Sequence, residues 1–488
     1  MVVYLKALLL LLLFTVAFTA EEEDELVFTF LVTRHGARSP AEELPADAKI
    51  TEDKFKIYIG DLTASGERQH YLEGVELQKI YEEQGTITKP FDPREFHVVS
   101  TNFNRTIMSA YSQLLGYFPL GSLPELSKAR NNKADPPFTV KGLSSMKRKL
   151  GTKATAENFQ PVPIHVSNID EIMLMMDKGF CPYQTELRKQ YTESNEWSEL
   201  NDKYQKVLFP ELHKNFGIKE ENLDFTTSYP YIDNYYSAWF EQMEIPNELS
   251  KDAKDQVDDI LRDGLYEGFF GMDLAVRLAT TKFFDLVKET LGQKINAILE
   301  KEGTPEFYEQ LKYMYISAHD SSLTAIMSGL LQKQEEQAYF ASNIIFELRR
   351  KKSSNANDLS DFTVALKWNG KKLNWATETC TSHACPFPAV KEFLESRMYQ
   401  GDLEAVCQNG LSSSSSIWLW ILLAVAIFIA LANIGYFAIR GLSRKDSGEN
   451  SKGNYSSFTD EEQHVKNEIN KSSSSTTPAS RYIDEDFD

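Results

Sequence analysis

The sequence LVFTFLVT at residues 26–33 runs directly into RHGARSP at residues 34–40, and this stretch indicates the fold class. Its first part is a continuous β-branched and aromatic run, long enough for one buried strand and too short for a helix. Two similar runs, HVVST at residues 97–101 and YMYIS at residues 313–317, also lead into apolar residues at helical spacing. Repeated strand-then-helix units predict an α/β fold in which a mostly parallel sheet is flanked by helices.

The region between the second and third runs has a different character and predicts an insertion. Its later part places Val276, Ala279, Phe283 and Val287 on one helical face. We therefore expect a mostly helical cap over roughly residues 145–270, followed by a helix that belongs to the core.

Three charged segments follow the predicted strands, where the carboxyl ends of parallel strands form the ligand crevice of an open α/β sheet. Their candidate site residues are Arg34, His35, Arg38, Arg105, His319 and Asp320. Arg105 lies at the start of a helix, where backbone N–H groups already favour an anion. Each segment alone also fits a solvated turn, a structural arginine or a chance His-Asp pair. Against the solvated turn, Arg34 adjoins a buried strand end, and we expect no acidic group nearby to pair with Arg34 or Arg38.

Together and in this order, the segments resemble the histidine acid phosphatase family, the second branch of the histidine phosphatases, and in particular its membrane-anchored lysosomal and prostatic group. The similarity goes beyond RHGARSP and SAHDSSL (residues 317–323) to LTASGERQ (62–69), PVPIH (161–165) and YFASN (339–343). It covers nearly all of residues 26–410. It implies the histidine phosphatase fold, with the same sheet and helical cap.

The resemblance also implies a reaction, the hydrolysis of phosphate monoesters at acidic pH. His35 would attack phosphorus and form a phosphohistidine, and neighbouring guanidiniums would keep it neutral by lowering its pKa. Asp320 would protonate the leaving group, which requires a carboxylic acid that an acidic lumen keeps protonated. The residues implied to bind the phosphoryl oxygens are Arg34, Arg38, Arg105 and His319.

The two ends of the chain predict its compartment. Residues 1–20 carry one lysine, a leucine-rich run and small residues before an acidic stretch, which is typical of a secretory signal peptide. Residues 417–439 contain no charge and at about 1.5 Å per residue can span a hydrocarbon core of about 30 Å. Basic residues follow at once and place the tail in the cytosol. We expect a single-pass type I membrane protein of lysosome, endosome or cell surface, with residues 21–410 lumenal or extracellular.

The tail at residues 440–488 lacks apolar periodicity and should be disordered. It contains Tyr455-Ser-Ser-Phe458, which fits a pattern read by endocytic sorting adaptors but also occurs readily by chance. The formal net charge of -19 argues against nucleic-acid binding.

The four cysteines leave three disulfide pairings open, of which the resemblance favours Cys181 with Cys407 and Cys380 with Cys385. No histidine or cysteine spacing matches a metal site, and no nucleotide-binding motif occurs, so we expect neither a metal nor another cofactor.

Two alternatives to a broad acid phosphatase remain. One is a narrower phosphatase that acts on inositol phosphates or a lysophospholipid. The other is an inactive ectodomain used for binding or as a receptor, which predicts the loss of at least one of the six site residues, and all six are present. The natural substrate stays open, as does the oligomeric state, for which a homodimer is one alternative.

Overall fold

The computed structural model describes residues 24–42, 55–167, 181–219, 223–225, 227–243, 249–332, 335–352, 358–410, 423 and 425–434. The expected signal peptide at residues 1–20 and the expected tail at residues 440–488, with its tyrosine pattern at Tyr455, lie outside these residues. Of the expected membrane span at residues 417–439, only residues 423 and 425–434 are described, and they are helical. Among the described residues, no helix has both the length and the apolar character needed to cross a bilayer.

Within the described residues, eight strands form one sheet in the order β3-β2-β4-β1-β5-β6-β7, with β8 paired to β6. The strands are β1 (Glu25–Arg34), β2 (Phe96–Thr101), β3 (His165–Ser167), β4 (Tyr313–Ala318), β5 (Asn343–Arg350), β6 (Phe362–Trp368), β7 (Lys371–Leu373) and β8 (Ala384–Pro386). The first four strands pair in parallel, whereas every pairing that involves β5 to β8 is antiparallel. The sheet is therefore mixed, and the expectation of a mostly parallel sheet is wrong.

One hairpin of the antiparallel half, β6 with β7, has a local cause that the prediction overlooked. Asn369 and Gly370 join β6 to β7, and both have positive φ values of 46° and 76°. Two consecutive residues with positive φ fit the tight hairpin turn whose twist matches that of the flanking strands. An Asn-Gly pair after an apolar run is a strong hairpin signal, and it was present in the sequence.

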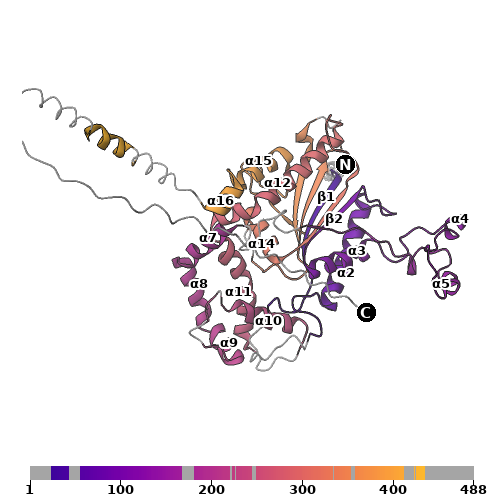
Figure 1. The fold of residues 1–488 in the computed structure, drawn as a ribbon, viewed down its shortest axis with the longest axis horizontal. Helices are drawn as coiled ribbons and strands as arrows, with labels where there is room; N and C mark the ends of the chain where they lie inside the picture. The colour runs from indigo at the N-terminus through magenta and orange to yellow at the C-terminus, as the bar shows by residue number, and fades with distance from the viewer. Residues whose placement is uncertain are drawn as a thin grey trace, which may run out of the picture. The chain divides into compact units, whose positions relative to one another are not determined.

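Helices cover both faces of the sheet (Figure 1). On one face α2 (Ala64–Glu83) and α3 (Asn104–Tyr117) pack against each other, and on the other lie α12 (Asp273–Ile298), α14 (Asp320–Gly329) and α15 (Phe387–Arg397). Along β1, Phe30 and Val32 pack into the core on the α12 side, while Leu31 between them packs on the α2 and α3 side. Burial on both faces explains why the run at residues 26–33 does not alternate with polar residues.

A separate group of helices lies beside this sheet and makes a second core. They are α7 (Pro182–Thr192), α8 (Asn195–Gln205), α9 (Leu208–Phe216), α10 (Tyr229–Phe240) and α11 (Lys251–Phe270). Their core also contains Ala37 and Phe340 from the strand-end loops, so these helices pack directly over the RHGARSP turn.

Several short elements complete the chain. They are α4 (Lys128–Asn131), α5 (Leu143–Leu150), η2 (Ala156–Asn158), α13 (Glu306–Gln310), η4 (Leu359–Asp361) and α16 (Leu403–Asn409). α4 and α5 bury no residue and lie in an arm apart from the sheet and the helical group (Figure 1).

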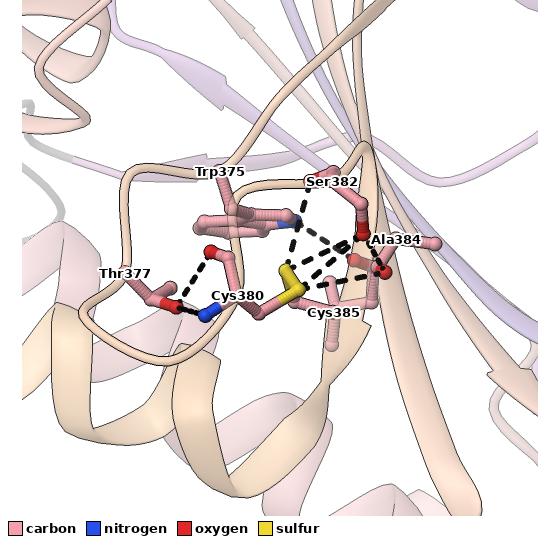
Figure 2. Close-up of a disulfide and its surroundings, with 7 residues drawn as sticks. Trp375, Thr377, Cys380, Ser382, Ala384 and Cys385 are labelled. Carbon is pink, nitrogen blue, oxygen red and sulfur yellow. Dashed lines mark hydrogen bonds between the residues drawn. A yellow bond between two sulfur atoms is a disulfide. The ribbon is translucent and has the colours of Figure 1, made fainter.

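The structure contains two disulfides, and they join the pairs that the resemblance favoured. Cys181–Cys407 ties the residue before α7 to α16. Cys380–Cys385 closes a short loop next to β6 and β8 (Figure 2). In that loop the backbone N–H of Cys380 donates to the hydroxyl of Thr377 at 2.8 Å, and the indole of Trp375 donates to the carbonyl of Val364 at 2.8 Å.

Candidate active site

The carboxyl ends of β1, β2 and β4 meet at one edge of the sheet. Arg34 at the end of β1 lies opposite Ala318 at the end of β4, and Ser100 of β2 lies opposite Ser317 of β4. The backbone N–H of His35 donates to the carbonyl of Ala318 at 2.9 Å, which continues the parallel ladder by one residue. This edge brings together all six candidate residues, namely Arg34, His35, Arg38, Arg105, His319 and Asp320.

Two glycines let the backbone of the RHGARSP turn pack against the first turn of α2. A Cβ on Gly36 would lie 2.5 Å from the carbonyl oxygen of Gly66, and a Cβ on Gly66 would lie 2.2 Å from the carbonyl oxygen of Ala37. The hydroxyl of Thr63 accepts the N–H of Gly66 and so caps α2 at this contact. The LTASGERQ segment therefore packs against the turn that carries His35 and fixes the position of that turn.

His35 is buried, and its hydrogen bonding leaves one ring nitrogen free. Its Nδ1 lies 2.8 Å from the carbonyl oxygen of Gly36. Because a carbonyl can only accept, the proton of a neutral ring must be on Nδ1, which leaves the lone pair on Nε2. Burial lowers the pKa of His35 well below its usual value, and the charges of Arg105, Arg34 and Arg38 lower it further. Burial is thus the main cause of a neutral ring, ahead of the guanidiniums that the sequence suggested.

Arg38 has an acidic partner, contrary to the expectation from the sequence. Its Nη1 and Nη2 donate to the two carboxylate oxygens of Asp233 at 3.0 and 2.8 Å, and both side chains are buried. Asp233 lies on α10 of the helical group, 195 residues away in the chain, and it also accepts the N–H of Ala41 at 2.8 Å. The helical group therefore orients one of the site's guanidiniums, and nothing in the local sequence pointed to Asp233.

Arg34 also has a partner, and that partner is Asp320. Arg34 Nη2 lies 2.8 Å from Asp320 Oδ2, while Nη1 donates to the carbonyl of Ala338 and the guanidinium lies 4.3 Å from the centre of the Phe340 ring. Burial by itself raises the pKa of Asp320, but the positive charges of Arg34 and Arg38 bring that pKa below its usual value. In this state of the site Asp320 is a carboxylate even in mild acid.

Arg105 is the least paired of the three guanidiniums. Its Nη1 donates to the carbonyl of Gly60 at a long 3.5 Å, and its guanidinium lies 4.5 Å from the centre of the Phe103 ring. Burial and the charge of Arg38 lower its pKa to about 10. Among the described residues, the buried Nε atoms of Arg34, Arg38 and Arg105 all lack a hydrogen-bond acceptor. Three such donors around one neutral imidazole are suited to an oxyanion with several acceptor oxygens.

His319 is held by a pair of threonines. Its Nε2 lies 2.9 Å from the hydroxyl of Thr101, which lies 2.9 Å from the hydroxyl of Thr106. Thr106 can donate to the carbonyls of Thr101 and Phe103, so the Thr101 hydroxyl donates to Thr106 and accepts the Nε2 proton of His319. Burial and Arg105 lower the pKa of His319 to about 3, so the ring is neutral in mild acid. A phosphoryl oxygen would have to share the Nε2 proton with Thr101.

His70 is a second residue that sequence analysis missed. It is fully buried on α2, with Nε2 3.1 Å from the carbonyl oxygen of Arg34. Its Nδ1 lies 3.0 Å from Gln113 Oε1 and 3.2 Å from Glu73 Oε2. His70 therefore fixes the backbone of Arg34 from the side opposite the site. The only sequence signal was its place one residue after LTASGERQ.

A cavity of about 350 Å³ leads from Asp320 and Ser321 into the helical group. Its other lining residues are Glu42, Arg188, Trp197, Phe225, Tyr229, Pro230, Gly264, Leu265 and Phe269. The walls are thus largely aromatic or apolar, and Arg188 is the basic side chain among the described residues that line them. A small ligand in this cavity would have one end beside Asp320.

Comparisons with known proteins find relatives over most of the chain. The sequence profile of the histidine phosphatase superfamily (branch 2) matches residues 25–366. The chain is 28% identical to lysosomal acid phosphatase of Xenopus laevis over 409 residues, which is 83% of this chain and 84% of that protein. It is 26% identical to prostatic acid phosphatase of Mus musculus over 386 residues, 79% of this chain and 90% of that protein.

The fold is also similar to that of a solved enzyme. The Hafnia alvei phytase in complex with tartrate superimposes with a TM-score of 0.56 at 11% identity, over 78% of this chain and 98% of that chain. At this low identity the likeness concerns the fold alone.

Proposed function

Because the chain belongs to the histidine phosphatase superfamily (branch 2), we propose that this pocket hydrolyses phosphate monoesters through a phosphohistidine on His35. The family and the acid phosphatases that the chain resembles make it a phosphomonoester hydrolase. The observation that carries the proposed mechanism is a buried, neutral histidine whose pKa is lowered by the charges of three nearby guanidiniums, each with a buried Nε that has no acceptor among the described residues.

In the first step, Nε2 of His35 attacks phosphorus and the bond to the ester oxygen breaks. The free lone pair on Nε2 supports this role, since Nδ1 is held by the carbonyl of Gly36. The equatorial phosphoryl oxygens would accept from Arg34, Arg38 and Arg105, whose fixed charges offset the charge of the transferring group. Water then attacks the phosphohistidine and releases inorganic phosphate.

The leaving alkoxide needs a proton, and we assign its delivery to Asp320, which lines the cavity beside the site. The sequence suggested that an acidic lumen keeps the carboxyl of Asp320 protonated. The lowered pKa of Asp320 means that an acidic lumen alone does not do so. A phosphomonoester has a second pKa of about 6, so below that pH it arrives as a monoanion with one proton. When the phosphoryl oxygens of the substrate bind Arg34, Asp320 loses its ion-pair partner and the pKa of Asp320 rises. Asp320 can then accept the proton of the substrate and pass it to the leaving oxygen.

This route predicts the pH dependence of the full-length enzyme. The pKa of His35 is lowered, so kcat/KM should persist well below pH 6.5, and it should fall as the pH rises through the substrate's second pKa of about 6. The pH at which kcat/KM falls should therefore be lower for 2,2,2-trifluoroethyl phosphate than for ethyl phosphate. The shift should equal the difference between the second pKa values of the two esters. EDTA should leave both rates unchanged, because protein side chains supply the nucleophile and the positive charge.

Two results would count against the proposal. An alkaline limb at the same pH for both esters would mean that an enzyme group, and not the substrate, carries the proton. A folded chain without activity on either ester at any pH would reject the general phosphatase and favour the receptor alternative.

The size and charge of the cavity favour small phosphomonoesters over inositol polyphosphates. At about 350 Å³ the cavity is at the low end of the range of roughly 300–1,000 Å³ for small-molecule sites. A polyphosphate also needs several cations outside the catalytic cage, and the described part of this lining supplies one, Arg188.

We also propose that the enzyme is anchored in a lysosomal, endosomal or cell-surface membrane by residues 417–439. The absence of charge in this segment supports the anchor, and so do the exposed apolar side chains of its described part, such as Ile427, Phe428 and Leu431. Full-length protein should stay with membranes during extraction at alkaline pH, and a chain that ends at residue 410 should be released. Release of the full-length protein would reject the anchor.

A further inference from the structure

The cavity beside Asp320 contains a basic side chain that the proposed reaction does not use. Arg188 lies on α7 and is partly buried, and its guanidinium lies 3.9 Å from the centre of the Phe269 ring. Within the part of the chain that the structure describes, it makes no hydrogen bond or ion pair. Burial lowers its pKa, which the charge of Asp224 only partly offsets. The guanidinium thus lies in a partly desolvated place with five N–H donors available to a ligand.

The surroundings of Arg188 define what such a ligand looks like. Trp197, Phe225 and Tyr229 line the same cavity as Arg188, and so do Asp320 and Ser321. A leaving group bound in this cavity would extend from Asp320, the proposed proton donor, along apolar walls to the guanidinium of Arg188. The acidic group on the lining besides Asp320 is Glu42, and no ion pair joins it to Arg188.

We propose that Arg188 is the anion-binding end of a leaving-group subsite. The subsite selects phosphomonoesters whose leaving group has an aromatic or apolar body and carries a second anionic group, a carboxylate or another phosphate. A planar guanidinium that stacks on Phe269 keeps its edge free for two parallel hydrogen bonds to such a group. This inference rests on the proposed function, since it assigns the far end of the same substrate.

The test compares enzyme variants on matched aryl phosphates. The probes are phenyl phosphate and its 4-carboxy, 4-carboxymethyl and 4-(2-carboxyethyl) derivatives, which carry the anion at increasing distance. The variants of the full chain are Arg188→Met, which keeps the apolar stem, Arg188→Lys, which keeps the charge, and Lys189→Met. Lys189 is an exposed cation next to Arg188 on α7, so it is a control for general charge effects.

Arg188→Met is expected to lower kcat/KM for the best-fitting carboxylated probe about 10-fold, mainly through KM, the order expected for a charged hydrogen bond. The same variant should leave phenyl phosphate unchanged to within about 2-fold. Arg188→Lys should recover part of the loss, and Lys189→Met should cause none. Each comparison is made on one substrate across variants, because a carboxyl substituent also changes the acidity of the leaving phenol.

Other results would overturn the subsite. Equal losses on phenyl phosphate and on the carboxylated probes would make Arg188 a structural residue that supports Phe269. Unchanged rates on every probe would mean that Arg188 does not contact the substrate. In both cases normal turnover of phenyl phosphate by the wild type would leave the proposed function standing, whereas no turnover of any probe by the wild type would reject both.

Discussion

Replacing His35 with alanine is expected to lower kcat for p-nitrophenyl phosphate by a factor on the order of 10⁴ to 10⁶, as loss of an enzymatic nucleophile does. His35 has its Nδ1 bonded to the carbonyl of Gly36 and lies near the charges of three guanidiniums, so its removal leaves the site's positive charge without the proposed group to attack phosphorus. Steady-state kinetics of the full chain at pH 5 measure the loss. Quenching wild type during turnover with alkaline detergent should give a base-stable phosphoenzyme that is lost on later exposure to acid and that His35→Ala lacks.

The control is His165→Ala, which removes an exposed histidine on β3 that stacks on His97 at 4.6 Å and lies outside the site. It should retain wild-type kcat. The inactive variant should still be folded and should still gain thermal stability from inorganic phosphate, because all three guanidiniums remain. Residual kcat within about 10-fold of wild type, or a phosphoenzyme that persists in His35→Ala, would assign the nucleophile to another residue.

The six candidate residues could be predicted from sequence because each lies at the end of a strand or within four residues after it. A residue at a strand end has a fixed position relative to the sheet, so three parallel strands that are neighbours bring their following residues together. The pairing of β1 with β4 and of β4 with β2 does this for His35, Arg105 and His319. The chemistry of these residue types then indicated an anion site.

The groups that tune those six residues could not be predicted. Asp233, which pairs with Arg38, comes from the inserted helices, whose packing depends on side-chain shape and follows no periodic pattern in the sequence. The prediction of a protonated Asp320 was wrong because its ionisation depends on a distance of 2.8 Å to Arg34, which a sequence does not give. In the antiparallel half of the sheet, the Asn369-Gly370 turn is a local signal for one hairpin, but the antiparallel pairing of β5 with β1 joins segments more than 300 residues apart and has no such local signal.

The second large effect is expected from Asp320→Asn, and it should depend on the leaving group. Asp320 accepts a hydrogen bond from the N–H of Ser321 at 2.7 Å. Asparagine keeps the shape of the side chain and can still accept this hydrogen bond, but it has no acidic proton. Ethyl phosphate leaves as a strongly basic alkoxide and needs that proton, so its kcat should fall by about 10³. p-Nitrophenyl phosphate leaves without protonation, so its kcat should fall by no more than about 10-fold.

The variant also breaks the ion pair with Arg34, so the matched control is Asp233→Asn, which breaks the ion pair with Arg38. Asp233 lies in the helical group and positions a guanidinium, and its loss should lower kcat/KM for both esters by the same factor. The ratio of the rates for the two esters should change about 100-fold in Asp320→Asn and stay constant in Asp233→Asn. This result would identify Asp320 as the proton donor. If Asp320→Asn lowers both rates equally, Asp320 only holds Arg34, and the proton must reach the leaving oxygen directly from the substrate or from water.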